Sequence, residues 1–130
     1  MVTDPVGDLI IRIKNAGMIG KAYIDVPHSR HKHDVAAKLK ELGLVDDTEK
    51  RGKETPVLRI VVSYNEDGTA KINNVKRLSK PGRRVYKKSH EAHAVKNGRG
   101  YLVLSTPRGI LTDAEARKNR VGGEALFEIW

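Results

Sequence analysis

The chain has 130 residues, 38% of them hydrophobic and 32% charged, which is typical of a small globular protein with one domain or two very small ones and argues against a disordered chain. It contains no cysteine, so disulfides and thiolate chemistry are excluded, and it has no apolar run of about 18 residues that would predict a membrane span. The start of the chain lacks the basic and apolar regions of a secretory signal, so we expect a cytoplasmic protein.

The net charge of +9 is concentrated in one segment. Residues 1–70 hold 11 Lys and Arg against 11 Asp and Glu, and residues 100–130 hold four of each. Residues 71–99 hold ten Lys and Arg against a single acid, Glu91. A charge that served solubility alone would be spread out, whereas a concentrated charge is what a polyanion-binding surface requires.

The first predicted element is a helix that begins after Asp4. The Asp4 carboxylate can cap this helix, and Pro5 suits its first position. Either Gly17 or Gly20 can end it. Its apolar residues recur at helical spacing and are expected to face the core: Val6, Leu9, Ile10, Ile13 and Ala16.

A second helix is predicted over residues 29–42, with strands on either side of it. Ser29 can cap this helix and Gly43 can stop it. Its expected buried stripe consists of Val35, Leu39 and Leu42. The predicted strands of this half cover residues 23–27, 44–48 and 57–64.

A strong turn signal, Asn65-Glu66-Asp67-Gly68, ends this pattern, and short apolar islands in a basic background follow it. We therefore predict an α+β protein of two small α/β domains. Residues 1–66 would form an N-terminal α-β-α-β-β domain. Residues 67–130 would form a C-terminal domain that is mostly β with one short helix.

The C-terminal half is predicted to contain short strands. Its first apolar islands are typical of twisted or edge strands: Ile72, Val75, Leu78, Val85 and Tyr86. The remaining predicted elements are, in chain order, a turn at 79–82, one short helix at 89–96, a strand at 101–104 ended by a turn at 105–109, a helix from the capping box at 112–115 to about Asn119, a hinge-like turn at Gly122-Gly123 and a strand at 125–130.

The strongest candidate for function is the basic stretch of residues 76–88. It holds seven cations and no acid: Lys76, Arg77, Lys80, Arg83, Arg84, Lys87 and Lys88. Cations of this kind release counterions from a nucleic-acid backbone, arginine suits phosphate, and Tyr86 adds a face on which a base can stack. The alternative is a solvated sheet edge that only prevents aggregation. We favour nucleic acid, because the rest of the chain is balanced in charge.

Two weaker patterns have a simpler interpretation beside the functional one. Ser105 and Thr106 could contact the 2′-hydroxyls of an A-form minor groove, but on their own they are better explained as hydroxyls that cap a turn. The histidines of residues 28–33 invite a zinc proposal, yet only Asp34 adds a carboxylate nearby. A helix start that binds phosphate through Ser29, Arg30 and Lys32 is the better interpretation.

Enzyme signatures are weak. Gly98-Arg99-Gly100 lacks the rest of a dinucleotide-binding fingerprint, and no phosphate-loop motif is present. His90 and His93 flank Glu91, but titratable residues in a polar segment are usually exposed. We therefore expect no catalytic residues, no metal and no cofactor. A metal-dependent nuclease built on the histidines, and a regulatory RNA- or DNA-binding module, are the other hypotheses.

Several motifs resemble one known family, in the correct order and at the correct spacing. The longest are Gly100–Arg117 and Val121–Glu124, and earlier ones are Thr3-Asp4-Pro5, Ser29-Arg30 with Lys32, and the basic stretch with Ser79-Lys80-Pro81-Gly82 and Arg84-Val85-Tyr86. Together they are similar to the eighth protein of the small ribosomal subunit in its bacterial form. The likeness extends over the whole chain.

The resemblance implies a structural RNA-binding protein of the small subunit. Its partners would be the central domain of small-subunit ribosomal RNA, gripped through the minor groove, and neighbouring ribosomal proteins. Some bacterial relatives also repress translation of their own operon's messenger RNA. No membrane and no small-molecule substrate are implied.

The resemblance also implies site residues, matched position by position. The principal RNA site would consist of Tyr86, Ser105, Thr106, Gly122, Gly123 and Glu124. A second RNA segment would contact Thr3, Asp4, Ser29, Arg30 and Lys32. We expect Glu124 to accept a hydrogen bond from a base, a 2′-hydroxyl or a backbone N–H, and the two glycines to allow a close approach to RNA or a positive φ. Pro107 replaces a hydroxyl residue that is common in the family.

Overall fold

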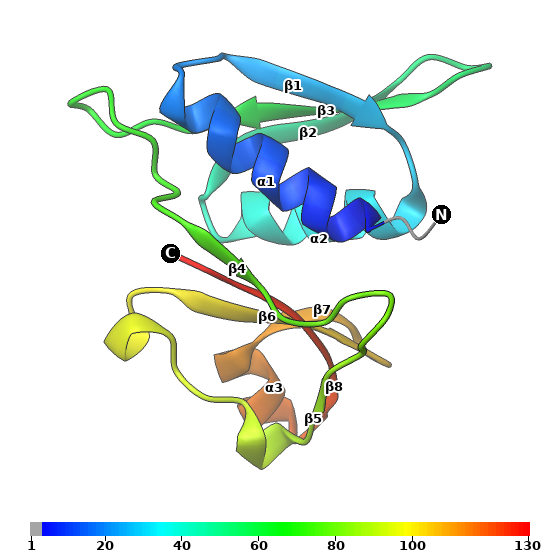
Figure 1. The fold of residues 1–130 in the computed structure, drawn as a ribbon, viewed down its shortest axis with the longest axis vertical. Coiled ribbons are helices and arrows are strands. Elements are labelled where there is room, and N and C mark those ends of the chain that lie inside the picture. The colour runs from blue at the N-terminus through cyan, green and yellow to red at the C-terminus, as the bar shows by residue number, and fades with distance from the viewer. Residues whose placement is uncertain (1–3) are drawn as a thin grey trace. The chain divides into compact units, whose positions relative to one another are not determined.

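A computed structural model describes residues 4–130 of the chain (Figure 1). It divides into two compact units. We call Asp8–Asn73 the N-terminal unit, and the described residues up to Gly7 together with Asn74–Trp130 the C-terminal unit. Each unit has its own antiparallel sheet, which confirms the predicted α+β fold. Across the described residues, no helix is long and apolar enough to span a membrane.

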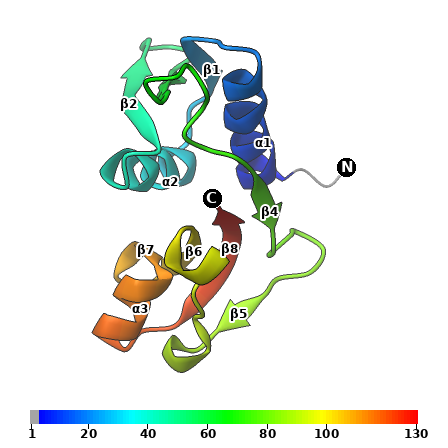
Figure 2. The ribbon, with the colours of Figure 1, turned by 90° about the vertical axis from the view of Figure 1, so that its left-hand side faces the viewer.

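The N-terminal unit has a three-stranded sheet of order β1-β3-β2, in which all neighbours are antiparallel. Its elements follow the predicted α-β-α-β-β order. They are α1 (Pro5–Met18, whose first turn counts with the C-terminal unit), β1 (Tyr23–Pro27), α2 (Arg30–Glu41), β2 (Val45–Arg51) and β3 (Val57–Val62). Both helices lie on the same side of the sheet (Figures 1 and 2).

The two predicted helix caps are confirmed. Asp4 Oδ1 accepts from the Gly7 backbone N–H at 3.1 Å, and Ser29 Oγ accepts from that of Lys32 at 3.2 Å. The predicted apolar face of α1 is buried throughout, as are Val35 and Leu39 of α2. Leu42 is only half-buried, because α2 ends at Glu41 and Leu42 is its C-cap.

The contacts divide the chain later than the predicted boundary between residues 66 and 67. Residues 65–68 do form a turn, in which Gly68 has a φ of 89°. After it, however, Ala70 pairs with Tyr64, and the Lys71 N–H donates to the Ser63 carbonyl at 3.2 Å. The sequence pattern did not reveal this short return of the chain to the N-terminal unit.

The C-terminal unit has a five-stranded sheet of order β4-β8-β6-β7, with β5 also paired to β8. The strands are β4 (Val75–Arg77), β5 (Tyr86–Lys87), β6 (Tyr101–Thr106), β7 (Gly109–Thr112) and β8 (Gly123–Ile129). Helix α3 (Asp113–Asn119) begins at the predicted capping box of Thr112 and Glu115 and packs against β6 and β7. One cluster of the buried core of this unit consists of Ala92, Val95, Leu102, Leu104, Ala116 and Ala125.

Three local predictions for this unit were wrong. Residues 89–96 do not form one helix, because two 3-10 turns, η1 (Ser89–Glu91) and η2 (Lys96–Gly98), are separated by extended backbone at Ala92. Gly123 belongs to β8 and not to a turn, since the chain reverses at Arg120, whose φ is 54°. Strand β7 was not predicted, because Gly109 was assigned to a turn and Thr112 to the cap of the following helix.

Candidate nucleic-acid interface

Strand β8 brings three predicted site residues into one row. Tyr86 of β5 is the register partner of Glu124, and Glu124 is the partner of Ser105 on β6. Residues directly opposite one another in an antiparallel sheet project from the same face. An exposed aromatic ring, a carboxylate and a hydroxyl therefore follow one another across the sheet, and Tyr86 is 70% exposed.

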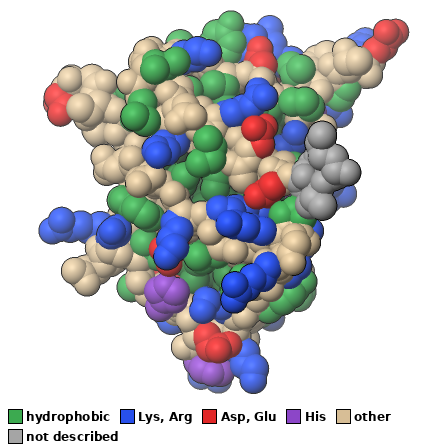
Figure 3. Space-filling view, in the orientation of Figure 1, with side chains coloured by type: hydrophobic (Ala, Val, Ile, Leu, Met, Phe, Trp, Pro, Cys, Tyr) green, Lys and Arg blue, Asp and Glu red, His purple; other side chains and the backbone are tan. Residues whose placement is uncertain are grey.

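The basic stretch lies along the edge of the same strand. Both β4 and β5 pair with β8, and Figure 3 shows Lys and Arg side chains gathered on the surface of this unit. A shallow groove of about 440 Å³ is lined by Lys76, Arg77, Leu78, Lys80, Arg83, Val85, Lys87, His93 and Glu128. Its one carboxylate, Glu128, lies 3.2 Å from His93. The groove therefore has a strong excess of positive charge.

Most of the predicted cations remain available to a ligand. Within residues 4–130, the following five have no carboxylate within ion-pair distance: Lys76, Lys80, Arg83, Lys87 and Lys88. Four of them are exposed, and Lys87 is half-buried. Unpaired surface cations are the groups that attract a polyphosphate chain.

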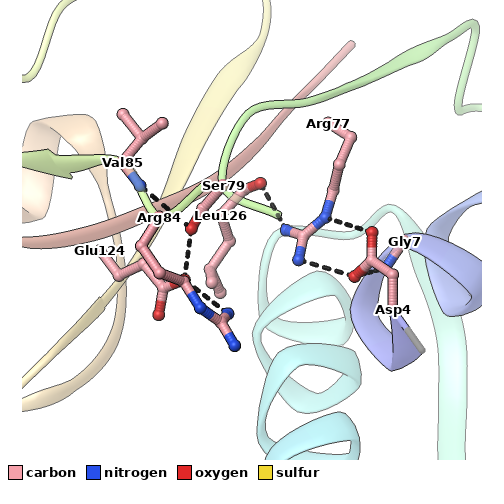
Figure 4. Close-up of polar contacts among 8 residues, drawn as sticks. All are labelled: Asp4, Gly7, Arg77, Ser79, Arg84, Val85, Glu124 and Leu126. Carbon is pink, nitrogen blue, oxygen red and sulfur yellow. Dashed lines mark hydrogen bonds and ion pairs between the residues drawn. The ribbon is translucent and has the colours of Figure 1, made fainter. Parts of the chain in front are cut away.

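Arg77 differs from these five because its guanidinium is used inside the fold. It binds both carboxylate oxygens of Asp4, at 3.0 and 2.8 Å, and donates to the Leu126 carbonyl at 2.6 Å (Figure 4). Burial raises the pKa of Asp4, but hydrogen bonds from Arg77 and Gly7 and the charge of Arg77 lower it by more. The pKa of Asp4 is therefore below its usual range. Asp4 and Arg77 were both predicted to bind RNA, and here they bind each other.

Glu124 is also engaged by the protein. Its Oε2 accepts from the Ser79 hydroxyl and from Arg84 Nη1, the latter at 3.0 Å (Figure 4). Burial raises the pKa of Glu124, but the two hydrogen bonds and the charge of Arg84 outweigh burial and lower it. Glu124 was expected to accept a hydrogen bond, and in the free chain its donors are the side chains of Ser79 and Arg84. Ser79 was predicted only as a turn residue, and no sequence signal linked it to a residue 45 positions away.

The two glycines have a structural role that the sequence did not predict. Neither Gly122 nor Gly123 has a positive φ. A Cβ on Gly122 would lie 2.5 Å from the Lys87 carbonyl oxygen, and one on Gly123 would collide with that of Ser105. Both positions need glycine because β5 and β6 approach the backbone of β8 closely.

The hydroxyls at the end of β6 are used unequally. Thr106 Oγ1 donates to the Gly109 carbonyl at 2.8 Å and accepts from the Arg108 N–H at 3.1 Å, which is the turn-capping arrangement considered from the sequence. Within the described residues, the Ser105 hydroxyl makes no hydrogen bond. Pro107 occupies the first central position of the two-residue turn between Thr106 and Gly109, where its fixed φ is favoured.

Three residues of the second predicted RNA contact, Ser29, Arg30 and Lys32, lie in the N-terminal unit, at the start of α2. Arg30 is exposed there, and Ser29 caps the helix. Thr3 lies outside the described residues. His28 and His33 contact each other at 3.1 Å between ring nitrogens, and among residues 4–130 no group of three potential metal ligands occurs. Burial and nearby positive charge lower the pKa of His28.

Comparison with known proteins identifies one family. The model of the family described as "Ribosomal protein S8" matches residues 4–130. The chain is 46% identical to the small ribosomal subunit protein uS8 of Rubrobacter xylanophilus over 131 residues, which cover 99% of this chain and 98% of that protein. It is 42% identical to the uS8 protein of Geobacillus kaustophilus over 131 residues, and 40% identical to that of Rhodopirellula baltica over 132, with at least 99% of each chain covered.

Proposed function

The chain belongs to the ribosomal protein S8 family, and from this premise we propose that it binds the central domain of small-subunit ribosomal RNA during assembly of the subunit. The family consists of structural proteins of the small ribosomal subunit and is not an enzyme family. The RNA would be held by its backbone and through its minor groove.

One observation carries the proposal: unpaired cations and a row of stacking and hydrogen-bonding groups lie along the same strand, β8. Cations supply affinity that does not depend on sequence, whereas hydroxyls and aromatic faces can distinguish a particular RNA shape. The alternative, a solvated sheet edge that only prevents aggregation, would explain the charges. It would not explain the exposed ring of Tyr86 or the hydroxyl of Ser105 that makes no hydrogen bond within the described residues.

The geometry suggests a division of roles among the predicted residues. The five unpaired cations would neutralise phosphates, Tyr86 would stack on a base, and the Ser105 hydroxyl would contact a 2′-hydroxyl or base edge. Arg77 and Asp4 would support the surface from inside the fold. Ser29, Arg30 and Lys32 would contact a second RNA segment through the start of α2.

The same surface would also serve the second RNA that the family resemblance implied, the protein's own operon messenger. A messenger that folds into a helix like that of the ribosomal RNA would compete for the same cations and hydroxyls. Competition between the two RNAs for the purified protein would measure this directly.

Chemical footprinting of small-subunit ribosomal RNA, with and without the protein, tests the proposal. We expect protection confined to a helix of the central domain, and binding to that helix at least about a thousandfold tighter than to duplex DNA of equal length. Equal protection along the whole RNA would instead indicate a general nucleic-acid-binding module. Cleavage of the RNA only when a divalent metal is added would favour the nuclease hypothesis.

A further inference from the structure

A small loop carries much of the exposed charge, and both of its ends are attached to one residue of β8. The Ser79 N–H donates to the Ala125 carbonyl at 3.1 Å, and the Ala125 N–H donates to the Val85 carbonyl at 2.8 Å. Between these anchors, residues 80–84 form what we call the basic loop. Three of its five residues are cations: Lys80, Arg83 and Arg84.

The basic loop is closed at its tip by a tight turn. Lys80 and Arg83 exchange two backbone hydrogen bonds of 2.9 Å each, around Pro81 and Gly82. Proline fixes one φ angle of this turn, which lowers the number of conformations open to the free loop. The tip and the base are thus defined by the backbone.

The side of the basic loop is held by a single hydroxyl. Ser79 is completely buried, its Oγ accepts from the Val85 N–H at 3.2 Å, and it donates to Glu124 Oε2 (Figure 4). The same carboxylate oxygen binds Arg84 at 3.0 Å. The chain of contacts from Val85 through Ser79 and Glu124 to Arg84 therefore joins the end of the loop to one of its cations.

We propose that Ser79 is a positioning residue of the RNA-binding surface, which orders the basic loop on β8 before RNA arrives. The inference rests on the proposed function. Ordering a flexible loop and its long side chains during binding costs free energy, and a loop that is ordered beforehand avoids this cost. Ser79 itself is buried, so it acts through Glu124, Arg84 and Val85 and not by contact with RNA.

The carboxylate of Glu124 has a second part in this arrangement. It holds Arg84 in the absence of RNA and offsets one positive charge beside Lys80 and Arg83. The Arg84 side chain is 49% exposed, whereas that of Glu124 is 19% exposed. Arg84 can therefore turn from Glu124 to a phosphate while Glu124 stays bound to Ser79.

The first experiment measures order in the free protein. Amide hydrogen exchange of Val85 and residues 80–84 is compared in the parent, Ser79→Ala and Glu124→Gln. In Ser79→Ala we expect faster exchange of the Val85 amide, which loses its acceptor, and of the loop amides. In Glu124→Gln the Val85 amide should stay protected, since the Ser79 hydroxyl remains. A Val85 amide as protected in Ser79→Ala as in the parent would overturn the proposal.

The second experiment measures binding of central-domain ribosomal RNA by the same variants. Ser79→Ala should bind about five- to tenfold more weakly, the scale of one lost hydrogen bond. Ser63→Ala, which alters another buried serine in the N-terminal unit, is the matched control and should bind like the parent. Faster loop exchange with unchanged RNA affinity would refute the positioning role alone. Failure of the parent to bind central-domain RNA would refute the proposed function instead.

Discussion

The two units hold almost equal numbers of basic residues but use them differently. The N-terminal unit has 12 Lys and Arg against 10 Asp and Glu, and five of its cations pair with carboxylates: Arg12, Lys38, Lys40, Arg51 and Arg59. The C-terminal unit has 13 against 6, and five cations of its basic stretch have no such partner among the described residues. Charge that is already paired attracts RNA weakly, so the pairing strengthens the preference for the C-terminal unit that the distribution of charge along the chain already indicates.

A similar contrast separates two arginines of the C-terminal unit. Arg77 has a side chain that is 12% exposed and binds Asp4, whereas Arg84 is 49% exposed and binds Glu124. The partly buried pair is expected to stabilise the fold, because removing Arg77 takes away two hydrogen bonds and the positive charge that faces the Asp4 carboxylate. The exposed pair is expected to contribute little to stability and more to binding.

The largest effect on stability is predicted for Gly123→Ala. The added methyl would collide with the Ser105 carbonyl oxygen, and β6 and β8 cannot separate without breaking their ladder. We expect a loss of about 3 kcal/mol in the free energy of unfolding, measured by urea denaturation. Gly82→Ala is the control, since a Cβ there meets nothing within 4 Å. Equal stability of the two variants would show that close packing does not explain the glycine.

A smaller loss is predicted for Arg77→Ala, which removes the two guanidinium hydrogen bonds of the Asp4 carboxylate and one of the two donors to the Leu126 carbonyl. We expect about 2 kcal/mol of destabilisation in the same assay. Arg84→Ala should cost little stability but weaken RNA binding. The reverse pattern, with Arg84 critical for folding and Arg77 only for binding, would contradict the division between the two arginines.

Local features of the fold were predictable from the sequence, whereas contacts between distant residues were not. Capping residues and apolar spacing are local signals, so Asp4, Ser29 and Thr112 placed the three helices correctly. The pair of Asp4 and Arg77 joins residues 73 positions apart, and Ser79 meets Glu124 across 45. Such contacts depend on strand register, which the local pattern did not define. The extended backbone at Ala92 likewise interrupts the helix predicted over residues 89–96.

Acid should weaken the C-terminal unit through Glu124. Because its folded-state pKa is lowered from 4.5, its contribution to stability is complete above that pH and is lost as the pH falls through the lower folded-state value. Thermal unfolding of Glu124→Gln should therefore depend less on pH below 4.5 than that of the parent. Glu66→Gln removes an exposed carboxylate of the N-terminal unit and controls for net charge. Identical pH profiles for parent and Glu124→Gln would refute this linkage.

The smallest effect is predicted for Ser105→Ala. Its hydroxyl has no hydrogen bond within the described residues, so stability should change by no more than about 0.5 kcal/mol. Affinity for central-domain RNA should fall about fivefold, with an unchanged salt dependence, because no phosphate contact is lost. Thr106→Ala is the comparison, since it should reduce stability as well by removing the two turn contacts. RNA affinity that is unaffected by Ser105→Ala would remove Ser105 from the site.

The contrast between the units is tested most directly by the salt dependence of RNA binding in two triple variants of equal charge change. One replaces Lys80, Arg83 and Lys87 of the C-terminal unit with alanine, and the other replaces the exposed Lys21, Lys53 and Lys71 of the N-terminal unit. We predict that the slope of log affinity against log salt falls by about two units in the first and stays at the parent value in the second. Equal slopes in the two variants would contradict the claim that RNA is held by the unpaired cations beside β8.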